Sequence, residues 1–283
     1  MDARWFQIAF LTSLLVFGAW ARDFALSNEQ VLLTFLAALA TQAVWQHGLA
    51  LPTRNTWQGY LSALVSSLGI SILVRAENLW VHPVLAVLAM SSKYLFRAGP
   101  ASCRSHVLNP ANFAAFAAWA WMPGAWLSPG QWGSESLAAL WFFALGGLVT
   151  QSISRWDVSL SFLASWAFLL AARLWWLDYE AEVALGMWRQ QISNGAVLLF
   201  AFFMISDPMT TPQHRVARIA YAIFVALAAF IWQWVLFRPH GMIVMLFFGS
   251  FAVPFINFWL PENRFTWLKV PLQPKASHVK STA

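Results

Sequence analysis

The sequence predicts an all-α, polytopic membrane protein. Of its 283 residues, 60% are hydrophobic and only 10% are charged, whereas a soluble globular protein has about 45–50% apolar and about 25% charged residues. Long apolar stretches recur along most of the chain, and a helix needs about 20 such residues to cross a bilayer. The single cysteine excludes an internal disulfide. Too few polar groups therefore remain to cover a soluble domain.

The apolar stretches define the expected membrane spans. They number ten and lie near residues 5–21, 30–50, 59–74, 79–96, 110–126, 136–153, 158–177, 190–206, 213–236 and 241–260. The first is expected to be retained as a helix, because it lacks a small-residue cleavage site and continues into the charged pair Arg22-Asp23.

Lysine and arginine are unevenly distributed between these spans. With the N-terminus inside, 12 of the 17 Lys and Arg fall on the inner side and 5 on the outer side. Because cytoplasmic loops carry an excess of these residues, we expect a multi-pass protein of the cell's inner (plasma) membrane with both termini in the cytoplasm. The net charge of +6 then reflects topology and contact with anionic membrane lipid, and no nucleic acid partner is expected.

Prolines interrupt corresponding segments in the two halves of the chain. One segment contains Pro110 and Pro123, and a later segment contains Pro239 and Pro254. Such matched interruptions indicate inverted repeats with a binding site between them. The alternative is that the prolines simply start ordinary helices, where their missing N–H costs nothing.

These patterns predict a single membrane domain over residues 1–260. It would consist of about ten transmembrane helices in two five-helix inverted repeats, covering about 1–127 and 128–260. Residues 261–283 are polar and form a cytoplasmic tail that we expect to be disordered. No HExxH, CxxC, Walker or dinucleotide motif occurs, so neither a metal site nor a catalytic residue is predicted. Function must then reside within the membrane or in short loops.

The first candidate binding segment surrounds the start of a predicted helix. Asn109 suits the N-cap and Pro110 the first turn, so free backbone N–H groups would lie beside Lys93 and Arg97, as an anion or a polar ring requires. Asn112 would place a carboxamide in the hydrocarbon region, where an unpaired amide is costly. The alternative is a capped helix next to a cluster of inner-side charges.

The second candidate segment contains an acid at the edge of the membrane, Asp207. Two hydroxyl side chains follow it, Thr210 and Thr211. Thr211 is expected to cap the next helix, which would start at Pro212. The nearest basic partners in the sequence are His214, Arg215 and Arg218. An acid so close to hydrocarbon indicates function, in a polar pocket that faces the Asn109 cap, although a structural helix–turn–helix would need the same residues.

Six motifs carry a resemblance to a known family. They are SKYLFR (92–97), HVLNPANF (106–113), SPGQWGS (128–134), SRWD (154–157), FMISDPMTTP (203–212) and PHGMIVMLFFGSFAVPFINF (239–258). Over about residues 85–260 the sequence resembles the NqrB/RnfD family, the ten-helix membrane subunits of the sodium-translocating NADH:quinone reductase and of the Rnf electron-transport complex. Within that family it is most similar to the stand-alone, UnbU-like (RnfD-like) branch.

The resemblance implies a membrane subunit of an electron-transfer system that binds a flavin and passes electrons across or within the membrane, with or without a coupled ion. A redox partner protein or a quinone would then be its partner. Family members esterify FMN to a threonine in an S-x-A-T motif, which this sequence lacks, so we expect FMN or riboflavin to bind non-covalently. The expected flavin-binding residues are Lys93, Arg97, Asn109, Pro110, Asn112, Phe113, Asp207, Thr210 and Thr211.

Such a site is chemically reasonable, because an asparagine carboxamide can meet both the acceptors and the N–H of a flavin edge. The ring faces could pack on Phe113, Tyr94 and Trp119, while the cofactor supplies the redox chemistry. The main alternative is a non-redox transporter or channel for a small solute on the same inverted-repeat fold, since the flavin-ester motif is missing. A scaffold subunit, in which these residues are purely structural, is the third hypothesis.

Overall fold

The computed structural model describes residues 2, 4–21, 26–48, 56–99, 104–128, 136–263 and 265. The described chain is mostly helical, which confirms the predicted class. Most of the predicted tail and most of the SPGQWGS motif lie outside the described residues.

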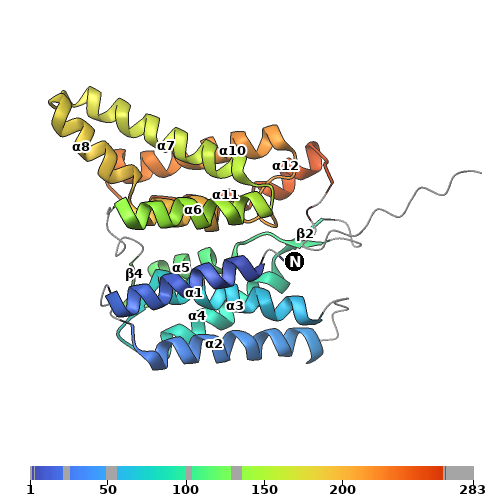
Figure 1. Cartoon of the computed structure of the whole chain (residues 1–283). Helices are drawn as coiled ribbons and strands as arrows, with labels where there is room; N and C mark the ends of the chain where they lie inside the picture. Colours follow the sequence, from blue (N-terminus) through green and yellow to red (C-terminus); the bar gives the residue numbers. More distant parts are fainter. Residues whose placement is uncertain are drawn as a thin grey trace, which may run out of the picture.

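The helices form two groups, one from the first part of the chain (α1 to α5) and one from the second part (α6 to α12) (Figure 1). In the first group they are α1 (Arg4–Ala21), α2 (Asn28–Ala43) with its π-helical continuation η1 (Val44–Gly48), α3 (Thr56–Leu73), α4 (Val81–Leu95) and α5 (Pro110–Trp121). In the second group they are α6 (Ser136–Ser152), α7 (Trp156–Trp176), α8 (Ala181–Ile192), α9 (Gly195–Leu199) with η4 (Phe200–Met204), α10 (Arg215–Phe230) with η5 (Ile231–Val235), α11 (Gly241–Ser250) and α12 (Val253–Trp259).

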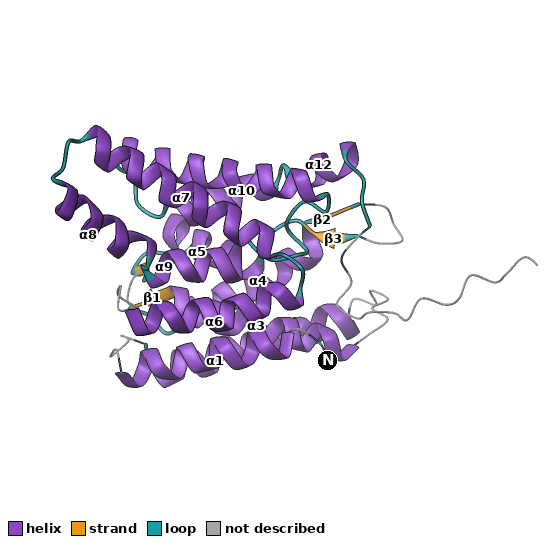
Figure 2. Ribbon diagram, turned by 45° about the horizontal axis from the view of Figure 1, so that its top comes forward, coloured by secondary structure: helices purple, strands orange, loops and turns teal. Residues whose placement is uncertain are grey.

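Two short strand pairs lie at opposite ends of the helices (Figure 2). They are β1 (Val74–Ala76), antiparallel to β4 (Ala125–Leu127), and β2 (Arg97–Ala98), antiparallel to β3 (Ser105–His106). Neither pair is predicted by the sequence, because a strand of two or three residues is too short to show an alternating pattern. We call the end with β2 and β3 the Asp207 end, after the acid that lies there.

Helices occupy all ten predicted stretches, with three differences in their limits. An additional helix, α8, fills most of the loop expected between 177 and 190 and ends at Ile192, inside the next predicted stretch. The helix expected to start at Pro212 begins at Arg215, because the Thr211 hydroxyl donates to the Asp207 carbonyl, at 2.9 Å, inside the preceding turn. α5 ends at Trp121, since a residue that precedes proline, here Met122, disfavours the helical conformation.

Length and hydropathy identify fewer membrane spans than the sequence pattern predicts. Among the described residues, two helices are long and apolar enough, over Trp156–Trp176 and Arg215–Val235. α11 and α12, bent by 46°, would make a third if they form one span. The ten-span arrangement therefore stays a prediction.

The two groups repeat the same order of packing partners. In the first group, α3 packs on α1 and α2, α2 packs on α4, and α4 packs on α5. In the second, α9 and η4 pack on α6, η4 packs on α7, α7 packs on α10, and α10 packs on α11. The helix α8 has no counterpart among the described residues of the first group. It folds back on α7, where the Trp188 indole N–H donates to the carbonyl of Ala167 at 2.8 Å.

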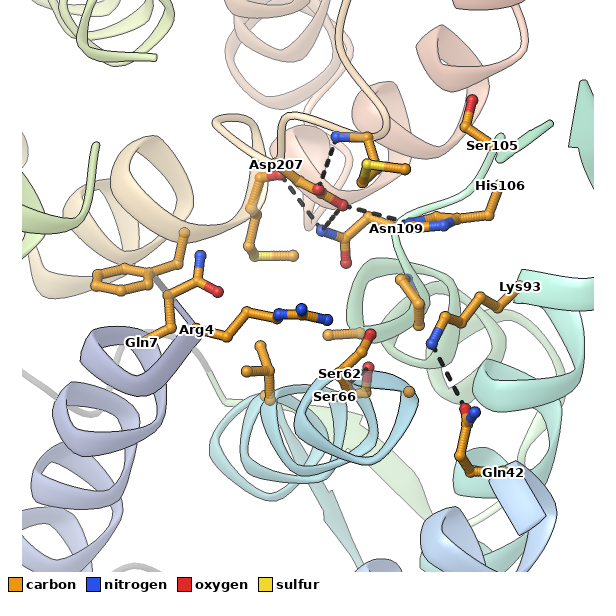
Figure 3. A pocket seen from close by; sticks show the side chains of 18 of the residues that line it. Arg4, Gln7, Gln42, Ser62, Ser66, Lys93, Ser105, His106, Asn109 and Asp207 are labelled. Carbon is orange, nitrogen blue, oxygen red and sulfur yellow. Dashed lines mark hydrogen bonds and ion pairs between the residues drawn. The ribbon is translucent and has the colours of Figure 1, made fainter. Parts of the chain in front are cut away.

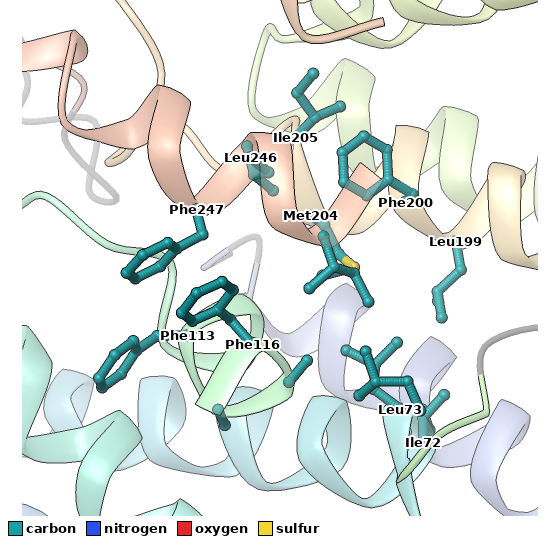
Figure 4. Packing of buried hydrophobic residues seen from close by; sticks show 14 of the residues in the cluster. Ile72, Leu73, Phe113, Phe116, Leu199, Phe200, Met204, Ile205, Leu246 and Phe247 are labelled. Atoms are coloured by element: carbon teal, nitrogen blue, oxygen red, sulfur yellow. The ribbon is translucent and has the colours of Figure 1, made fainter. Parts of the chain in front are cut away.

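The groups meet where α5 crosses α11 (Figure 4). The ring of Phe116 stacks on that of Phe247, with centroids 3.9 Å apart and planes 7° apart. Beside them, the amide of Asn112 donates to the carbonyl of Ile243 at 3.2 Å. Each pair joins residues at the same position counted from the start of its helix, the seventh and the third. Contacts between equivalent positions are what a two-fold relation produces.

At the end opposite Asp207, a buried arginine closes α3. The guanidinium of Arg75 donates to the carbonyls of Ser71 and Val74, both at 2.7 Å. Burial lowers its pKa to about 10. Because the C-terminal end of a helix carries a partial negative charge, these carbonyls stabilise the cation.

Candidate functional site

A cavity of about 280 Å³ lies at the Asp207 end, between the two helix groups (Figure 3). We call it the Asp207 cavity. Its titratable lining side chains are Arg4, Lys93, Tyr94, Arg97, Arg104, His106 and Asp207. Its apolar lining includes Leu11, Val65, Leu73, Leu199, Phe203 and Met204. One side of the cavity is thus polar and charged, and another could hold an apolar ring.

Small residues on α3 leave the space for this cavity. They lie three or four residues apart and line it together: Gly59, Ser62, Ser66 and Gly69. Residues at this spacing share one face of a helix. A Cβ atom on Gly69 would lie 2.8 Å from the Cβ of Ala111, so this glycine also lets α3 approach α5 closely.

Asn109 caps α5 and connects the two helix groups. Its side-chain oxygen accepts from the N–H of Asn112 at 3.1 Å, and Pro110 occupies the first turn, which confirms the predicted cap. Its amide nitrogen donates to the Asp207 carboxylate at 3.3 Å and to the carbonyl of Met204 at 3.5 Å. The carboxamide is therefore held rigidly by both groups at the edge of the cavity.

Asp207 follows η4 and remains ionised. It accepts from the N–H of Met209 at 3.0 Å, and its carboxylate lies 3.8 Å from His106 Nε2. Burial raises the pKa of the Asp207 carboxyl, but hydrogen bonding to His106, the charge of that ring and the N–H of Met209 together outweigh burial. The pKa therefore lies below its usual value.

Two of the three basic residues named as sequence neighbours of Asp207, Arg215 and Arg218, bind a different acid. Arg218 donates to the Asp157 carboxylate from Nε at 2.8 Å and from Nη2 at 2.7 Å, and Arg215 Nε lies 3.6 Å away. Next to this cluster, Arg155 donates to the side-chain oxygen of Gln213 at 2.7 Å. Burial and the charge of Arg218 lower the pKa of Arg155 to about 10. The nearest basic residues in sequence are therefore not the partners of Asp207, because residues close in sequence need not face each other.

Lys93 sits in the last turn of α4 among neutral polar groups. Its ammonium lies 3.5 Å from the side-chain oxygen of Gln42 and 5.8 Å from the ring centroid of Tyr94. The amide of Gln42 donates to Gln46, at 2.7 Å, and to the Tyr94 hydroxyl, at 2.5 Å. Within the described chain, Lys93 has no acid at ion-pair distance.

The structure brings together five of the nine predicted binding residues. Those that line the Asp207 cavity are Lys93, Arg97, Asn109, Pro110 and Asp207. The lining residues do not include Asn112, Phe113, Thr210 and Thr211. The Asn112 amide is directed to α11, while its side-chain oxygen is buried and has no hydrogen bond to any described residue. Phe113 stacks on Phe247, with centroids 6.0 Å apart. Of the expected aromatic walls, only Tyr94 lines the cavity, where Phe203 joins it.

Sequence reasoning missed the wall formed by the first three helices. Arg4 and Gln7 come from α1, Gln42 from α2 and Gln46 from its continuation η1. These two glutamines are four residues apart within an apolar stretch, and their side chains are hydrogen-bonded to each other, so they share one face. Polar side chains inside a predicted span indicate a polar interior site, and this signal could have identified that part of the wall.

The family match begins at the cavity. The sequence model of the NQR2, RnfD, RnfE family matches residues 106–266, more than half of the chain. The chain belongs to this family. The family region therefore supplies His106, Asn109 and Asp207, while α1 to α4 lie before the matched residues. Membership confirms the predicted membrane class.

Similar proteins are named as components of an ion-translocating oxidoreductase complex. One such subunit, from Escherichia coli (strain K12 / DH10B), is 29% identical over 143 residues, which cover 50% of this chain and 35% of the relative. The protein of the same name from Shigella boydii serotype 18 (strain CDC 3083-94 / BS512) gives the same values. The chain thus spans about a third of the length of these relatives, 35%.

Proposed function

We propose that this chain is the membrane subunit of an electron-transfer system and that its Asp207 cavity binds FMN or riboflavin non-covalently. One observation carries the proposal: Asn109 from the HVLNPANF motif contacts Asp207 from the FMISDPMTTP motif at the edge of a cavity between the two helix groups. The relatives are named as subunits of an ion-translocating oxidoreductase complex. A redox partner protein or a quinone, and contact with membrane lipid, belong to the same proposal.

The residues of the cavity fit a flavin. Its volume of about 280 Å³ is close to the lower limit, about 300 Å³, of typical ligand pockets. Asn109 and Asp207 would meet the polar edge of the ring system, and Phe203 and Tyr94 would provide aromatic contacts. A bound flavin would supply electron transfer, whereas the chain would position it and set the charge around it.

We further propose that the two helix groups are inverted repeats and that both termini lie in the cytoplasm. The repeated packing order and the contacts between equivalent positions of α5 and α11 support the repeats. The excess of Lys and Arg on the inner side supports the position of the termini. Reporter fusions at each terminus test it. Both reporters should be active in the cytoplasm, and a reporter active on the outer side at either end would contradict the topology.

The flavin proposal is tested by purifying the full chain and recording its visible absorption spectrum. We expect a flavin spectrum and, after acid precipitation, flavin in the supernatant. Flavin in the pellet would mean a covalent link. A folded, colourless protein that takes up neither FMN nor riboflavin would overturn the proposal.

A pair of matched variants tests whether the flavin binds in the Asp207 cavity. Asn109→Ser keeps a capping oxygen but loses the amide that contacts Asp207, so flavin retention should fall. Asn194 caps α9, where it accepts from Ala196 N–H at 2.8 Å, and it does not line this cavity. Asn194→Ser should therefore retain flavin as the unmodified chain does. Equal loss in both variants would argue against this location.

A second cavity favours the transporter alternative. It has a volume of about 170 Å³, and its lining includes Trp166, Asn194 and His240. Leu73 and Met204 line both cavities, so an apolar layer separates them and movement of these side chains would join them. Flux of a small solute into liposomes that contain a flavin-free protein, increased by Leu73→Ala, would support transport. Absence of flux for every solute tested, with flavin bound, would support the redox function.

A further inference from the structure

We propose that an anionic phospholipid binds with its phosphate in a pocket of arginines at the point where α7 and α10 begin. The pocket has a volume of about 360 Å³, and its charged lining consists of Arg155, Arg215, Arg218 and Glu262. We call it the arginine pocket. It shares no lining residue with the Asp207 cavity, so this inference goes beyond the flavin proposal and does not rest on it.

The arginine pocket lies at the end of the two clearest membrane spans. Among the described residues, Trp156–Trp176 and Arg215–Val235 are the two single helices long and apolar enough to cross a membrane. α7 and α10 pack side by side (Figure 2). Both begin at the pocket, because Arg155 directly precedes the first span and Arg215 starts the second. Lipid headgroups lie at this depth, where a span meets water.

The arginines of the pocket outnumber the acids beside them. Arg218 donates to the Asp157 carboxylate at 2.8 and 2.7 Å, and Arg215 lies 3.6 Å from the same carboxylate, so one acid serves two arginines. Within the described chain, Arg155 has no acid at ion-pair distance. Glu262 is exposed. Three arginines and two acids leave one positive charge, which the single negative charge of a phosphodiester would compensate.

Arg155 provides the strongest part of the argument, because it lines the pocket although it is only 4% exposed. It donates to the side-chain oxygen of Gln213 at 2.7 Å and to the carbonyl of Pro208 at 3.5 Å. Its buried Nε has no hydrogen bond to any described residue. A guanidinium has five donors, and burial of a charge without a counter-ion is costly. A phosphate in the pocket would supply both an acceptor and a counter-charge.

Backbone groups around the pocket also favour an anion. α7 and α10 have 21 and 16 residues, and the N-cap residue of neither helix bonds to the first turn through its side chain. The partial positive charge of both helix ends therefore adds to that of the arginines. Ser154, whose φ of 55° turns the chain between α6 and α7, is exposed in the pocket and offers a hydroxyl donor.

Apolar side chains beside the pocket favour a lipid over a free phosphate ester. Trp156 and Leu160, one turn apart on α7, and Val216 on α10 are exposed. The guanidinium of Arg215 lies 5.6 Å from the ring centroid of Trp156, and tryptophan is typical of headgroup depth. A phospholipid would use the arginines for its phosphate and this apolar surface for its acyl chains. A free phosphate ester would use the arginines alone.

Titration of the full chain with lipid tests the inference. The chain is purified in neutral detergent and freed of lipid. It is then titrated with phosphatidylglycerol or with phosphatidylcholine of identical acyl chains, while mass spectrometry of the intact complex counts the bound lipid. We expect phosphatidylglycerol to bind at least about tenfold more tightly, as one charge-assisted contact is worth. Arg155→Gln should remove this preference and leave phosphatidylcholine binding within about twofold.

Two further variants and a soluble ligand control the result. Arg215→Gln, at a side chain that is 64% exposed, should also reduce the preference and serves if Arg155→Gln does not fold. Arg189→Gln removes one positive charge from an exposed position on α8, outside the pocket, and should change neither affinity. Glycerol phosphate, which lacks acyl chains, should bind at least about tenfold more weakly than phosphatidylglycerol.

Three results would overturn the inference. Equal binding of both lipids to the unmodified chain, or the same preference in Arg155→Gln and Arg189→Gln, would refute the contact between arginine and phosphate. Glycerol phosphate that binds as tightly as phosphatidylglycerol would assign the pocket to a free phosphate ester. Binding of an acidic peptide such as polyglutamate, which phosphatidylglycerol does not displace, would assign the pocket to a protein partner.

Discussion

The contact between Asn109 and Asp207 offers the sharpest test of how the two helix groups are held together. Asn109 makes two kinds of hydrogen bond: its oxygen caps α5 at 3.1 Å, and its nitrogen donates to the carboxylate of Asp207 at 3.3 Å. Asn109→Ala removes both. Asn109→Ser keeps an oxygen for the cap and removes only the donor. Comparison of these variants therefore separates the stability that comes from the cap of α5 from the stability that comes from the contact with Asp207.

The expected magnitudes follow from the two contacts. Loss of an N-cap side chain costs about 1 kcal/mol. Loss of a hydrogen bond to a charged group costs about 1.5–3 kcal/mol, and the 3.3 Å distance favours the lower limit. We therefore expect Asn109→Ala to cost about 2.5 kcal/mol and Asn109→Ser about 1.5 kcal/mol.

Unfolding of the full chain in detergent, followed by the fluorescence of its 19 tryptophans, measures these effects. The order of stability should be unmodified, then Asn109→Ser, then Asn109→Ala. In an Asp207→Ala background, Asn109→Ser should cost much less, because its partner is already absent. Equal stability of the Ser and Ala variants would refute the contribution that the cap oxygen makes to stability. An Asn109→Ser cost that does not change in that background would refute the contact between the groups.

Three other predictions concern stability in acid, the ion pairs of Asp157 and the small residues of α3 that line the cavity. Because the pKa of Asp207 is lowered in the folded chain, its contribution to stability is complete above pH about 4 and is lost as pH falls further. Asp207→Asn should therefore weaken the loss of stability below this pH in a plot of unfolding free energy against pH. An unchanged loss would contradict the prediction. Arg218→Leu leaves the buried Asp157 carboxylate without its closest partner and should cost about 3 kcal/mol. Arg215→Leu, whose side chain is 64% exposed, should cost under about 1 kcal/mol in the same denaturation assay, so equal costs would contradict the assignment. Gly69→Val forces α3 away from α5 and should cost about 1–3 kcal/mol, and it should also weaken flavin binding; full stability would show that the two helices can separate freely.

The sequence predicts the helices well, because the signals for a helix are local. Apolar stretches mark all ten helical regions, and the Asn109-Pro110 pair marks the start of α5 to the residue. The sequence does not predict α8, because the segment between Ala181 and Ile192 includes charged and polar residues and lacks the apolar pattern of a membrane span. It also fails at the start of α10, where the Thr211 hydroxyl bonds to the preceding turn.

Only part of the candidate site could be predicted from the sequence, because its contacts join segments that are far apart in the chain. The motifs identify Asn109 and Asp207, and each is placed at the end of a helix as expected. Their contact spans 98 residues of sequence, so only helix packing could bring them together. The same packing decides that Asp207 faces His106 rather than the arginines that follow it.

The sequence by itself determines that this is a helical membrane protein, that α5 begins with an asparagine cap, and that two motif segments carry polar groups close to the hydrocarbon region. These are properties of composition and of neighbours within a turn. Only the tertiary structure decides that α1, α2 and the small residues of α3 complete a cavity around those segments. It also decides that Lys93 lies there without an acidic partner in the described chain. The charge balance of a cavity depends on which helices pack together, and no local pattern encodes it.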